Sequence, residues 1–328
     1  MSQRAQHVAV VGLGLIGGSV AQTLVADGRR VTGWDPDAST RELAGAAGVE
    51  AVATLEELAA SGAPLVVVAV PLRAVRATVE RLAASLPAST VLTDVASVKG
   101  PVRDAVQAAG LGDRYVGAHP MAGTEHSGFA AADPDLLREV RWAVTLDETT
   151  RLDAFLTVAE MITGPFASVV RPLSDDVHDA AVALVSHVPH VVATELLNLV
   201  VGSPVSEVAQ GLAAGSFRDG TRVARTTPRR TQAMVTDNAG WVAAALRRAA
   251  RDLEVLASRL EEGAQVDEFF DRADPLRGAP APDRSTRSLQ IGADGWQTDL
   301  TERGRQGAQV LAVDPAAASV ELSEPQAG

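Results

Sequence analysis

The sequence contains no cysteine, and this absence excludes several kinds of chemistry. The chain of 328 residues therefore has no disulfide, no thiolate zinc site, no iron–sulfur ligation and no thiol nucleophile. Aromatic residues amount to 3%, so few rings are available to stack on single-stranded nucleic acid. Basic residues number 29 against 41 acidic ones, and the net charge of −12 opposes binding to nucleic acid or to an anionic membrane. No apolar run approaches the roughly 20 residues of a membrane helix.

The residues that are present are typical of a globular protein. Hydrophobic residues make up 46% and charged residues 21% of the chain, so we expect a folded protein with a buried core. Arg4 and the apolar stretch that follows it imitate a signal peptide. Glycines at positions 12, 14, 17 and 18 interrupt that stretch, and a glycine-rich turn between a strand and a helix explains them better. We therefore expect a cytoplasmic protein.

The first half of the chain alternates between two kinds of segment. Short runs of β-branched residues predict strands, and the Ala-, Leu- and Glu-rich stretches between them predict helices. Because strands that are buried on both faces are nearly continuously apolar, this alternation predicts an α/β Rossmann-type domain with a doubly wound parallel sheet. The predicted strands are Val8–Val11, Arg30–Asp35, Leu65–Val70, Thr90–Val95 and Arg141–Leu146, and a clear helix is Ile16–Ala26.

After about residue 170, helical patterns replace the strands, beginning with residues 175–201. In residues 238–262, apolar residues recur every three or four positions and form one seam along a helix. Because a small second domain has little core of its own, we favour packing of this seam against a partner subunit over packing within the domain. The seam consists of Val242, Leu246, Ala249, Leu253, Leu256 and Leu260.

These patterns divide the chain into three parts. Residues 1–170 are predicted to form the dinucleotide-binding domain, and residues 171–276 an all-α domain for substrate binding and homodimerisation. Residues 277–328 begin with a linker rich in Pro and Ala and form a short C-terminal extension. The extension contains β-like runs, and the sequence leaves open whether they are strands or an unstructured tail. The runs are Ser288–Ile291, Gln309–Val313 and Ser319–Leu322.

A glycine-rich turn after the first predicted strand indicates a dinucleotide site. Gly12, Gly14 and Gly17 have the spacing GxGxxG between a strand and a helix. Gly12 allows a tight turn, Gly14 lets a pyrophosphate approach the backbone, and Gly17 lets the helix pack closely on the strand. The first residues of the helix, Leu15 and Ile16, contribute backbone amides at a helix N-terminus, where phosphates bind.

Asp35 lies at the end of the second predicted strand, where a carboxylate can accept hydrogen bonds from the adenine ribose. Its negative charge repels a 2′-phosphate, so the sequence favours NAD over NADP. Arg41, about one helical turn later, leaves NADP open. Either dinucleotide implies hydride transfer without identifying the substrate.

Two segments rich in reactive side chains lie where predicted parallel strands end. Residues 94–99 follow one strand, and residues 118–128 contain His119 directly before Pro120. Open α/β sheets bind ligands at the carboxyl ends of their strands, and the proline ring restricts the local backbone. An ordinary imidazole has a pKa of about 6.5 and can take up a proton near neutrality. A lone histidine is more often structural, but the Pro, Gly, Thr and Glu around His119 favour a functional site.

Six motifs, in order along the chain, resemble those of prephenate dehydrogenases and their arogenate-using relatives in tyrosine biosynthesis. The resemblance covers roughly residues 7–262, and its most specific motif is the loop 117–125. It implies an enzyme that transfers hydride from ring C4 of prephenate to NAD⁺, deprotonates the C4 hydroxyl and releases the ring carboxylate as CO₂. The other motifs are Gly12–Gly18, Ser97–Lys99, His178–Asp179, Ser186–His190 and Phe217–Arg222.

The resemblance also implies roles for individual residues and no bound metal. His119 matches the catalytic base, and Ser97 matches the hydroxyl residue that hydrogen-bonds the C4 oxygen. Arg222 matches the residue that holds a carboxylate of the dianionic substrate with two parallel hydrogen bonds, although a lone arginine more commonly forms a surface salt bridge. The remaining matches to substrate-binding positions are His190, Thr124 and Glu125.

Some positions leave the interpretation open. Thr231 stands where the family has a tryptophan that helps to close the substrate pocket, and Glu125 could accept an amine. Arogenate and a 4-amino-4-deoxy analogue are therefore alternatives to prephenate. Outside the family, the alternatives are a hydroxy-acid dehydrogenase and a non-catalytic nicotinamide-binding protein. We interpret His187 as structural and His178 as a helix-packing partner of Asp179.

Overall fold

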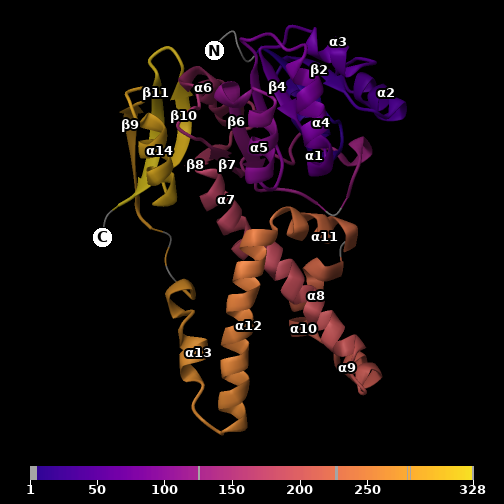
Figure 1. Cartoon of the computed structure of the whole chain (residues 1–328), viewed down its shortest axis with the longest axis vertical. Coiled ribbons are helices and arrows are strands. Elements are labelled where there is room, and N and C mark those ends of the chain that lie inside the picture. Colours follow the sequence, from indigo (N-terminus) through magenta and orange to yellow (C-terminus); the bar gives the residue numbers. More distant parts are fainter. Residues whose placement is uncertain (1–5, 125, 226–227, 279, 281, 327–328) are drawn as a thin grey trace. The chain divides into compact units, whose positions relative to one another are not determined.

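The computed structural model describes residues 6–124, 126–225, 228–278, 280 and 282–326, without the side chains of Arg229 and Arg230. The chain divides into two compact units (Figure 1). Met1–His178 together with Arg284–Gly328 forms the first unit, and Asp179–Asp283 forms the second. Ala279 and Ala281 of the predicted linker lie outside the described residues.

In the described part of the chain, the first unit contains one sheet of eleven strands, in the order β3-β2-β1-β4-β5-β6-β7-β8-β10-β11-β9. All pairs among β1 to β6 are parallel. Their order, 3-2-1-4-5-6, is that of dinucleotide-binding folds, so the predicted Rossmann-type sheet is confirmed for these strands. They are His7–Val11, Arg30–Trp34, Glu50–Ala51, Leu65–Val68, Val91–Asp94 and Tyr115–Pro120.

Beyond β6 the sheet is mixed, which the sequence did not predict. β7 (Arg141–Thr145) pairs antiparallel with β6 and parallel with β8 (Val169–Leu173). The C-terminal strands then follow with antiparallel pairing throughout. Antiparallel neighbours such as β10 and β11 need only a short turn between them, whereas parallel neighbours need a crossover. The C-terminal strands are β9 (Arg284–Gln290), β10 (Gln309–Asp314) and β11 (Ser319–Pro325).

Helices cover both faces of this sheet. One apolar core lies beneath α1, α6 and α14, and a second lies beneath α3, α4 and α5. Successive side chains of β1 point alternately into the two cores, as in a strand buried on both faces. The helices of this unit are α1 (Leu15–Ala26), α2 (Ala38–Ala46), α3 (Leu55–Ala59), α4 (Leu72–Ala83), α5 (Gly100–Ala108), α6 (Leu152–Thr163) and α14 (Trp296–Arg305), with the short 3₁₀ turns Gly112–Arg114 and Phe129–Ala131.

The C-terminal residues complete the first unit and are not a separate extension. Trp296 and Leu300 of α14, together with Val310 and Leu322 of the strands, are buried in the same core as α1 and α6. The β-like runs therefore form strands, because pairing beside β8 buries their apolar side chains (Figure 1). By its internal contacts the first unit ends at His178, eight residues after the predicted boundary at residue 170.

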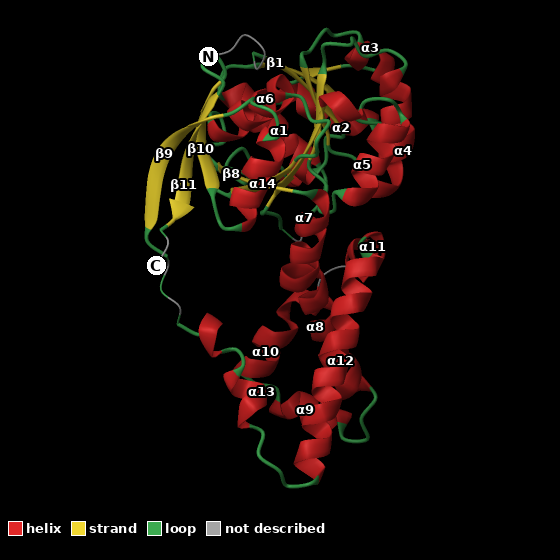
Figure 2. Ribbon diagram, turned by 60° about the vertical axis from the view of Figure 1, so that its left-hand side comes forward, coloured by secondary structure: helices red, strands yellow, loops and turns green. Residues whose placement is uncertain are grey.

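The described residues of the second unit form helices and the loops that connect them, with no strand (Figure 2). The predicted helix over residues 175–201 is not uniform: α7 (Asp175–Val182) passes through a π-helical turn, Ala183–His187, into α8 (Val188–Val201). Pro189, which has no amide hydrogen, is the second residue of α8 and lies two positions after the end of this turn. The other helices are α9 (Ser206–Leu212), α10 (Gly215–Thr221), α11 (Pro228–Asp237), α12 (Ala239–Glu261) and α13 (Asp267–Asp271), with the 3₁₀ turns Arg222–Arg225 and Asp274–Leu276.

Asp175–Val201 is long and apolar enough, by length and composition, to cross a membrane. The expectation that no apolar run approaches this length is therefore wrong. A single helix of this kind is weak evidence for a membrane span, and 22% of its most apolar window is buried within the protein. Several apolar side chains of the second unit are exposed, including Leu199 and Val201 of α8 and Leu253 and Leu260 of α12.

Candidate active site

The glycine-rich turn joins β1 to α1 at the carboxyl edge of the parallel strands. Gly12 has a φ of +91°, in the left-handed region that favours glycine. A Cβ at Gly17 would lie 1.9 Å from the carbonyl oxygen of Gly12, whereas a Cβ at Gly14 would meet nothing within 4 Å. Gly12 and Gly17 are thus required by the turn itself. Gly14 leaves open backbone beside the first amides of α1, those of Leu15 and Ile16, where dinucleotide phosphates fit.

Asp35 follows β2 and contacts the same turn. Its Oδ2 accepts a hydrogen bond from the amide of Leu13 at 2.9 Å, and its Oδ1 accepts one from the amide of Asp37 at 3.0 Å. The Nη1 of Arg41 donates to the carbonyl oxygens of Asp35 at 2.7 Å and Pro36 at 3.2 Å. Asp35 therefore holds the glycine-rich turn in addition to presenting a carboxylate beside it, a second role that the sequence did not predict.

A buried ion pair joins β5 to β6 beneath the predicted catalytic residues. Lys99 is fully buried, and its Nζ donates to Asp94 and, at 2.8 Å, to the carbonyl oxygen of Ala118. The hydroxyl of Tyr115 donates to Oδ2 of Asp94 at 2.6 Å. Burial, together with the negative charge of Asp94, raises the pKa of Tyr115 well above its usual value. Since Ala118 precedes His119, this network fixes the strand that carries the predicted base.

Gly117 makes room for the buried network. A Cβ at this position would lie 2.4 Å from the Oγ1 of Thr145 and 3.0 Å from the hydroxyl oxygen of Tyr115. The backbone of β6 can therefore run directly beside the polar groups of its neighbours only where the residue has no side chain. The glycine that opens the most specific sequence motif has a packing role in the site.

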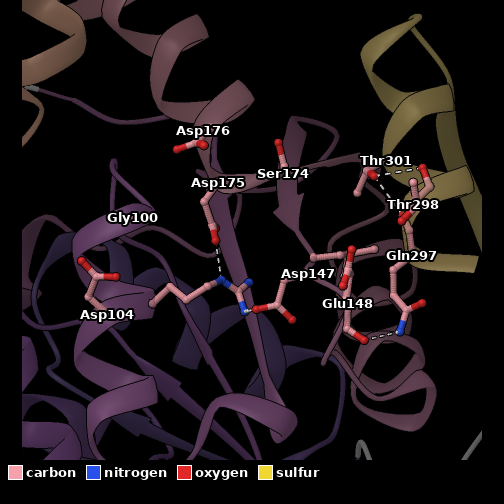
Figure 3. Close-up of a pocket in the computed structure, with 12 residues that line it drawn as sticks. Gly100, Asp104, Asp147, Glu148, Ser174, Asp175, Asp176, Gln297, Thr298 and Thr301 are labelled. Atoms are coloured by element: carbon pink, nitrogen blue, oxygen red, sulfur yellow. Dashed lines mark hydrogen bonds and ion pairs between the residues drawn. The ribbon is translucent and has the colours of Figure 1, made fainter. Parts of the chain in front are cut away.

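Arg103 of α5 forms a second anchor next to this network. Its guanidinium donates to Asp175, the first residue of α7, to Asp147 at 2.6 Å and to the carbonyl oxygen of Thr145 at 3.2 Å. It also lies over the ring of Tyr115, 5.0 Å from the ring centroid. Burial alone would lower the pKa of Arg103, but the neighbouring carboxylates outweigh it and the pKa lies above its usual value. Asp147 and Asp175 line a cavity of about 370 Å³ at this anchor (Figure 3).

His119 lies half-buried at the carboxyl end of β6, where it pairs with Ala143 of β7. Its Nδ1 lies 3.0 Å from the Nε2 of His178, and the two rings meet edge to face at 73°. His178 is 1% exposed and lies on α7. Our interpretation of His178 as a packing partner of Asp179 missed this contact, because a sequence does not show that α7 returns to the end of β6.

The other predicted residues of the first unit lie on loops at the carboxyl edge of the sheet. Ser97 is half-buried in the bend between β5 and α5. Thr124 follows β6, and its Oγ1 accepts a hydrogen bond from the amide of His126 at 3.3 Å. Glu125 lies outside the described residues. Within the described residues, no group of three or more potential metal ligands is placed to hold a metal ion.

The second unit contains the remaining predicted residues. The Nδ1 of His190 donates to the carbonyl oxygen of Ser186 at 2.8 Å. Arg222 begins the 3₁₀ turn after α10, and its side chain is exposed. Its guanidinium forms no ion pair or hydrogen bond with any of the described residues. Thr231 is half-buried on α11. His187 is buried and its Nδ1 accepts a hydrogen bond from Nδ2 of Asn238 at 3.1 Å.

Comparison with known proteins identifies the domain family of each unit. Residues 20–171 match the nucleotide-binding domain of prephenate dehydrogenase, and residues 174–272 match its dimerization domain. The chain belongs to the prephenate dehydrogenase family. It is therefore an oxidoreductase of an NAD-dependent family, and the predicted dinucleotide-binding domain followed by a helical domain is confirmed.

Individual members of the family match over most of their length. The cyclohexadienyl dehydrogenase of Zymomonas mobilis is 31% identical over 293 residues, which are 86% of this chain and 98% of that protein. The prephenate dehydrogenase of Bacillus subtilis is 32% identical over 236 residues, which are 70% of this chain and 63% of that protein. The structure of prephenate dehydrogenase from Aquifex aeolicus, in complex with hydroxyphenyl propionate and NAD⁺, has a TM-score of 0.76 at 26% identity and covers 84% of this chain and 98% of its own.

Proposed function

We propose that this chain catalyses the NAD-dependent oxidative decarboxylation of prephenate to 4-hydroxyphenylpyruvate. The observation that carries the proposal is the placement of His119 at the carboxyl end of β6, on a strand that Lys99 and Asp94 hold in position. Its Nδ1 faces His178, so Nε2 is the nitrogen that takes up a proton. Membership in the family supports the same reaction.

The proposed reaction removes a proton from the C4 hydroxyl oxygen and a hydride from C4 itself. His119 accepts the proton of the C4 hydroxyl, and Ser97 hydrogen-bonds the C4 oxygen, while the hydride on C4 leaves to the nicotinamide of NAD⁺. The bond between ring C1 and its carboxylate then breaks, CO₂ leaves, and the electron pair completes the aromatic ring. His119 returns its proton to the phenolate oxygen, so no proton is gained or lost overall.

Substrate binding requires positive groups, because prephenate is a dianion and the protein carries a net charge of −12. We assign one carboxylate to Arg222, whose exposed guanidinium has no partner among the described residues. His190 uses its Nδ1 in the contact with Ser186, which leaves Nε2 for the substrate. Thr124 and Glu125 are the further proposed substrate-binding residues.

For the cofactor we propose NAD rather than NADP. The carboxylate of Asp35 lies beside the glycine-rich turn, where its charge would repel a 2′-phosphate. Arg41 is occupied by the main-chain carbonyls of Asp35 and Pro36, which limits its use as a phosphate ligand. We further propose that the protein is a cytoplasmic homodimer, formed through the exposed apolar side chains of the second unit.

The first test is steady-state kinetics on prephenate and arogenate, each with NAD⁺ and NADP⁺. We expect the highest kcat/KM for prephenate with NAD⁺. A higher kcat/KM for arogenate would assign the amino substrate instead, and turnover of saturated hydroxy acids without CO₂ release would contradict the proposed reaction.

Two variants separate chemistry from binding. His119→Ala removes the base and should lower kcat by about 10²- to 10⁴-fold while NAD⁺ binding stays unchanged. Arg222→Ala should instead raise the KM for prephenate by about 10- to 100-fold, the value of one or two charge-assisted hydrogen bonds, with little effect on the KM for NAD⁺. Retained turnover in His119→Ala would disprove the assignment of the base.

A further inference from the structure

The contact between His119 and His178 involves one proton. Two neutral imidazole nitrogens 3.0 Å apart form a hydrogen bond only if one of them carries hydrogen and the other accepts it. If Nδ1 of His119 accepted the bond, its hydrogen would sit on Nε2, and Nε2 could not take a proton from a substrate. If Nδ1 of His119 donates, Nε2 keeps its lone pair and can act as a base.

Both rings are attached to parts of the first unit that are fixed by buried charges. On the side of His119, Lys99 donates to the carbonyl oxygen of the preceding residue, Ala118. On the side of His178, the first residue of α7, Asp175, is paired with Arg103. Arg103 is in turn held by Asp147, and its side chain is 7% exposed. The relative position of the two imidazoles is therefore set by rigid elements, and neither ring depends on a loop for its orientation.

We propose that His178 is a positioning residue for the reaction: its Nε2 accepts the Nδ1–H of His119 and so keeps the Nε2 lone pair of His119 available for the substrate proton. The inference rests on the proposed function, in which His119 is the base. His178 itself touches no reacting atom in this scheme. When His119 takes up the substrate proton, the same hydrogen bond strengthens, because a charged donor then faces a neutral acceptor.

The tautomer of His119 can be read in the wild-type chain without any substrate. The six histidines are labelled with ¹⁵N, and long-range ¹H–¹⁵N NMR of the full chain with NAD⁺, at a pH where imidazoles are neutral, distinguishes protonated from unprotonated ring nitrogens. Signals are assigned by their loss in His119→Asn and His178→Gln. We expect hydrogen on Nδ1 of His119. Hydrogen on Nε2 would overturn the proposal, whatever the enzyme's activity.

Kinetics of two variants at His178 provide the second test. His178→Leu, which has no acceptor, should lower kcat by about 10- to 100-fold, as loss of an orienting partner does at comparable sites, with less than about threefold change in either KM. His178→Gln places an amide oxygen near the position of Nε2 and should retain most of the wild-type kcat. The matched control is His187→Leu, which removes another buried histidine of the same helical run, one that pairs with Asn238. It should leave kcat per folded protein unchanged.

The outcomes separate this proposal from the proposed function. Wild-type kcat in His178→Leu would overturn the positioning role, and so would an equal loss in His187→Leu. If His119→Ala is inactive and His178→Leu is not, the proposed function stands and this inference fails. If His119→Ala keeps its turnover, the proposed function fails, and a base-positioning role for His178 fails with it.

Discussion

Tyr115 is the single tyrosine of the chain, and its hydroxyl lies in the buried network beneath His119. Asp94 accepts hydrogen bonds from both Tyr115 and Lys99. Ionisation of the phenol would place a second negative charge beside Asp94 in a site without water access, since Tyr115 is 0% exposed. Burial and Asp94 therefore hold the pKa of Tyr115 well above its usual value.

This environment predicts a loss of stability at alkaline pH. An unfolded tyrosine ionises near pH 10, whereas the folded protein keeps the Tyr115 proton to a higher pH. Above about pH 10 the unfolded state then binds fewer protons than the folded state, so the free energy of unfolding falls as the pH rises. Phenolate absorbance measured against pH should rise at higher pH for the native than for the denatured chain, and Tyr115→Phe should show no such signal. Superimposable titration curves of the native and denatured chain would contradict the buried hydrogen bond between Tyr115 and Asp94.

The sequence predicted residues that can be recognised from their immediate neighbours in the chain, and it missed the contacts that these residues make with distant segments. The turn glycines Gly12 and Gly17 and the proposed base His119 could be singled out because a glycine spacing and a His-Pro pair are readable within a few residues. The partner of His119 lies 59 positions further along the chain, at His178. Lys99 is part of the motif Ser97–Lys99, but its contacts with Asp94 and with the carbonyl oxygen of Ala118 depend on strand β6 lying beside β5. Only the folded chain makes such pairs neighbours.

At the scale of elements, α14 and the strands around it show how packing determines the secondary structure of a segment whose sequence fits more than one. The runs after residue 284 are short, and their pattern alone fitted either strands or a tail. In the structure they extend the sheet beside β8, and α14 packs on β8 next to Pro172. Gly304 of α14 permits this approach, because a Cβ there would lie 1.7 Å from the carbonyl oxygen of Pro172.

We therefore expect Gly304→Ala to destabilise the first unit strongly. The methyl group would push α14 away from β8, at a cost on the order of 3 kcal/mol in the free energy of unfolding, the upper part of the range for overpacked cores. Gly240→Ala is the matched control, since Gly240 also lies within a helix, α12, but a Cβ there meets nothing within 4 Å. It should leave stability unchanged or raise it by up to about 1 kcal/mol. Urea denaturation measures both, and equal effects would contradict the close approach of α14 to β8.

At the scale of the whole molecule, the exposed apolar side chains of the second unit predict self-association. Leu253 and Leu260 lie on the predicted seam of α12 and are 57% and 61% exposed in the single chain. Exposed apolar area of this kind marks an association surface, and this unit matches the family's dimerization domain.

We expect a mass of twice 33.9 kDa for the wild-type protein in analytical ultracentrifugation. Leu253→Asp together with Leu260→Asp should shift the mass towards that of one chain, because burial of carboxylates in an interface is costly. Leu43→Asp, at a 50% exposed leucine of α2 in the first unit, is the control and should leave the mass unchanged. A monomeric wild-type protein would contradict the proposed homodimer.

The sequence by itself determined the fold class and the glycine-rich turn, and it was enough to propose Asp35 and His119 as site residues, because each depends on spacing within one βα unit or one loop. The tertiary structure decided what long-range pairing controls: the C-terminal strands as part of the first unit, the buried Asp94–Lys99–Tyr115 network, and His178 beside His119. These features depend on the free energy gained when segments distant along the chain bury apolar surface and satisfy each other's charges. No local pattern of residues encodes which distant segments will meet.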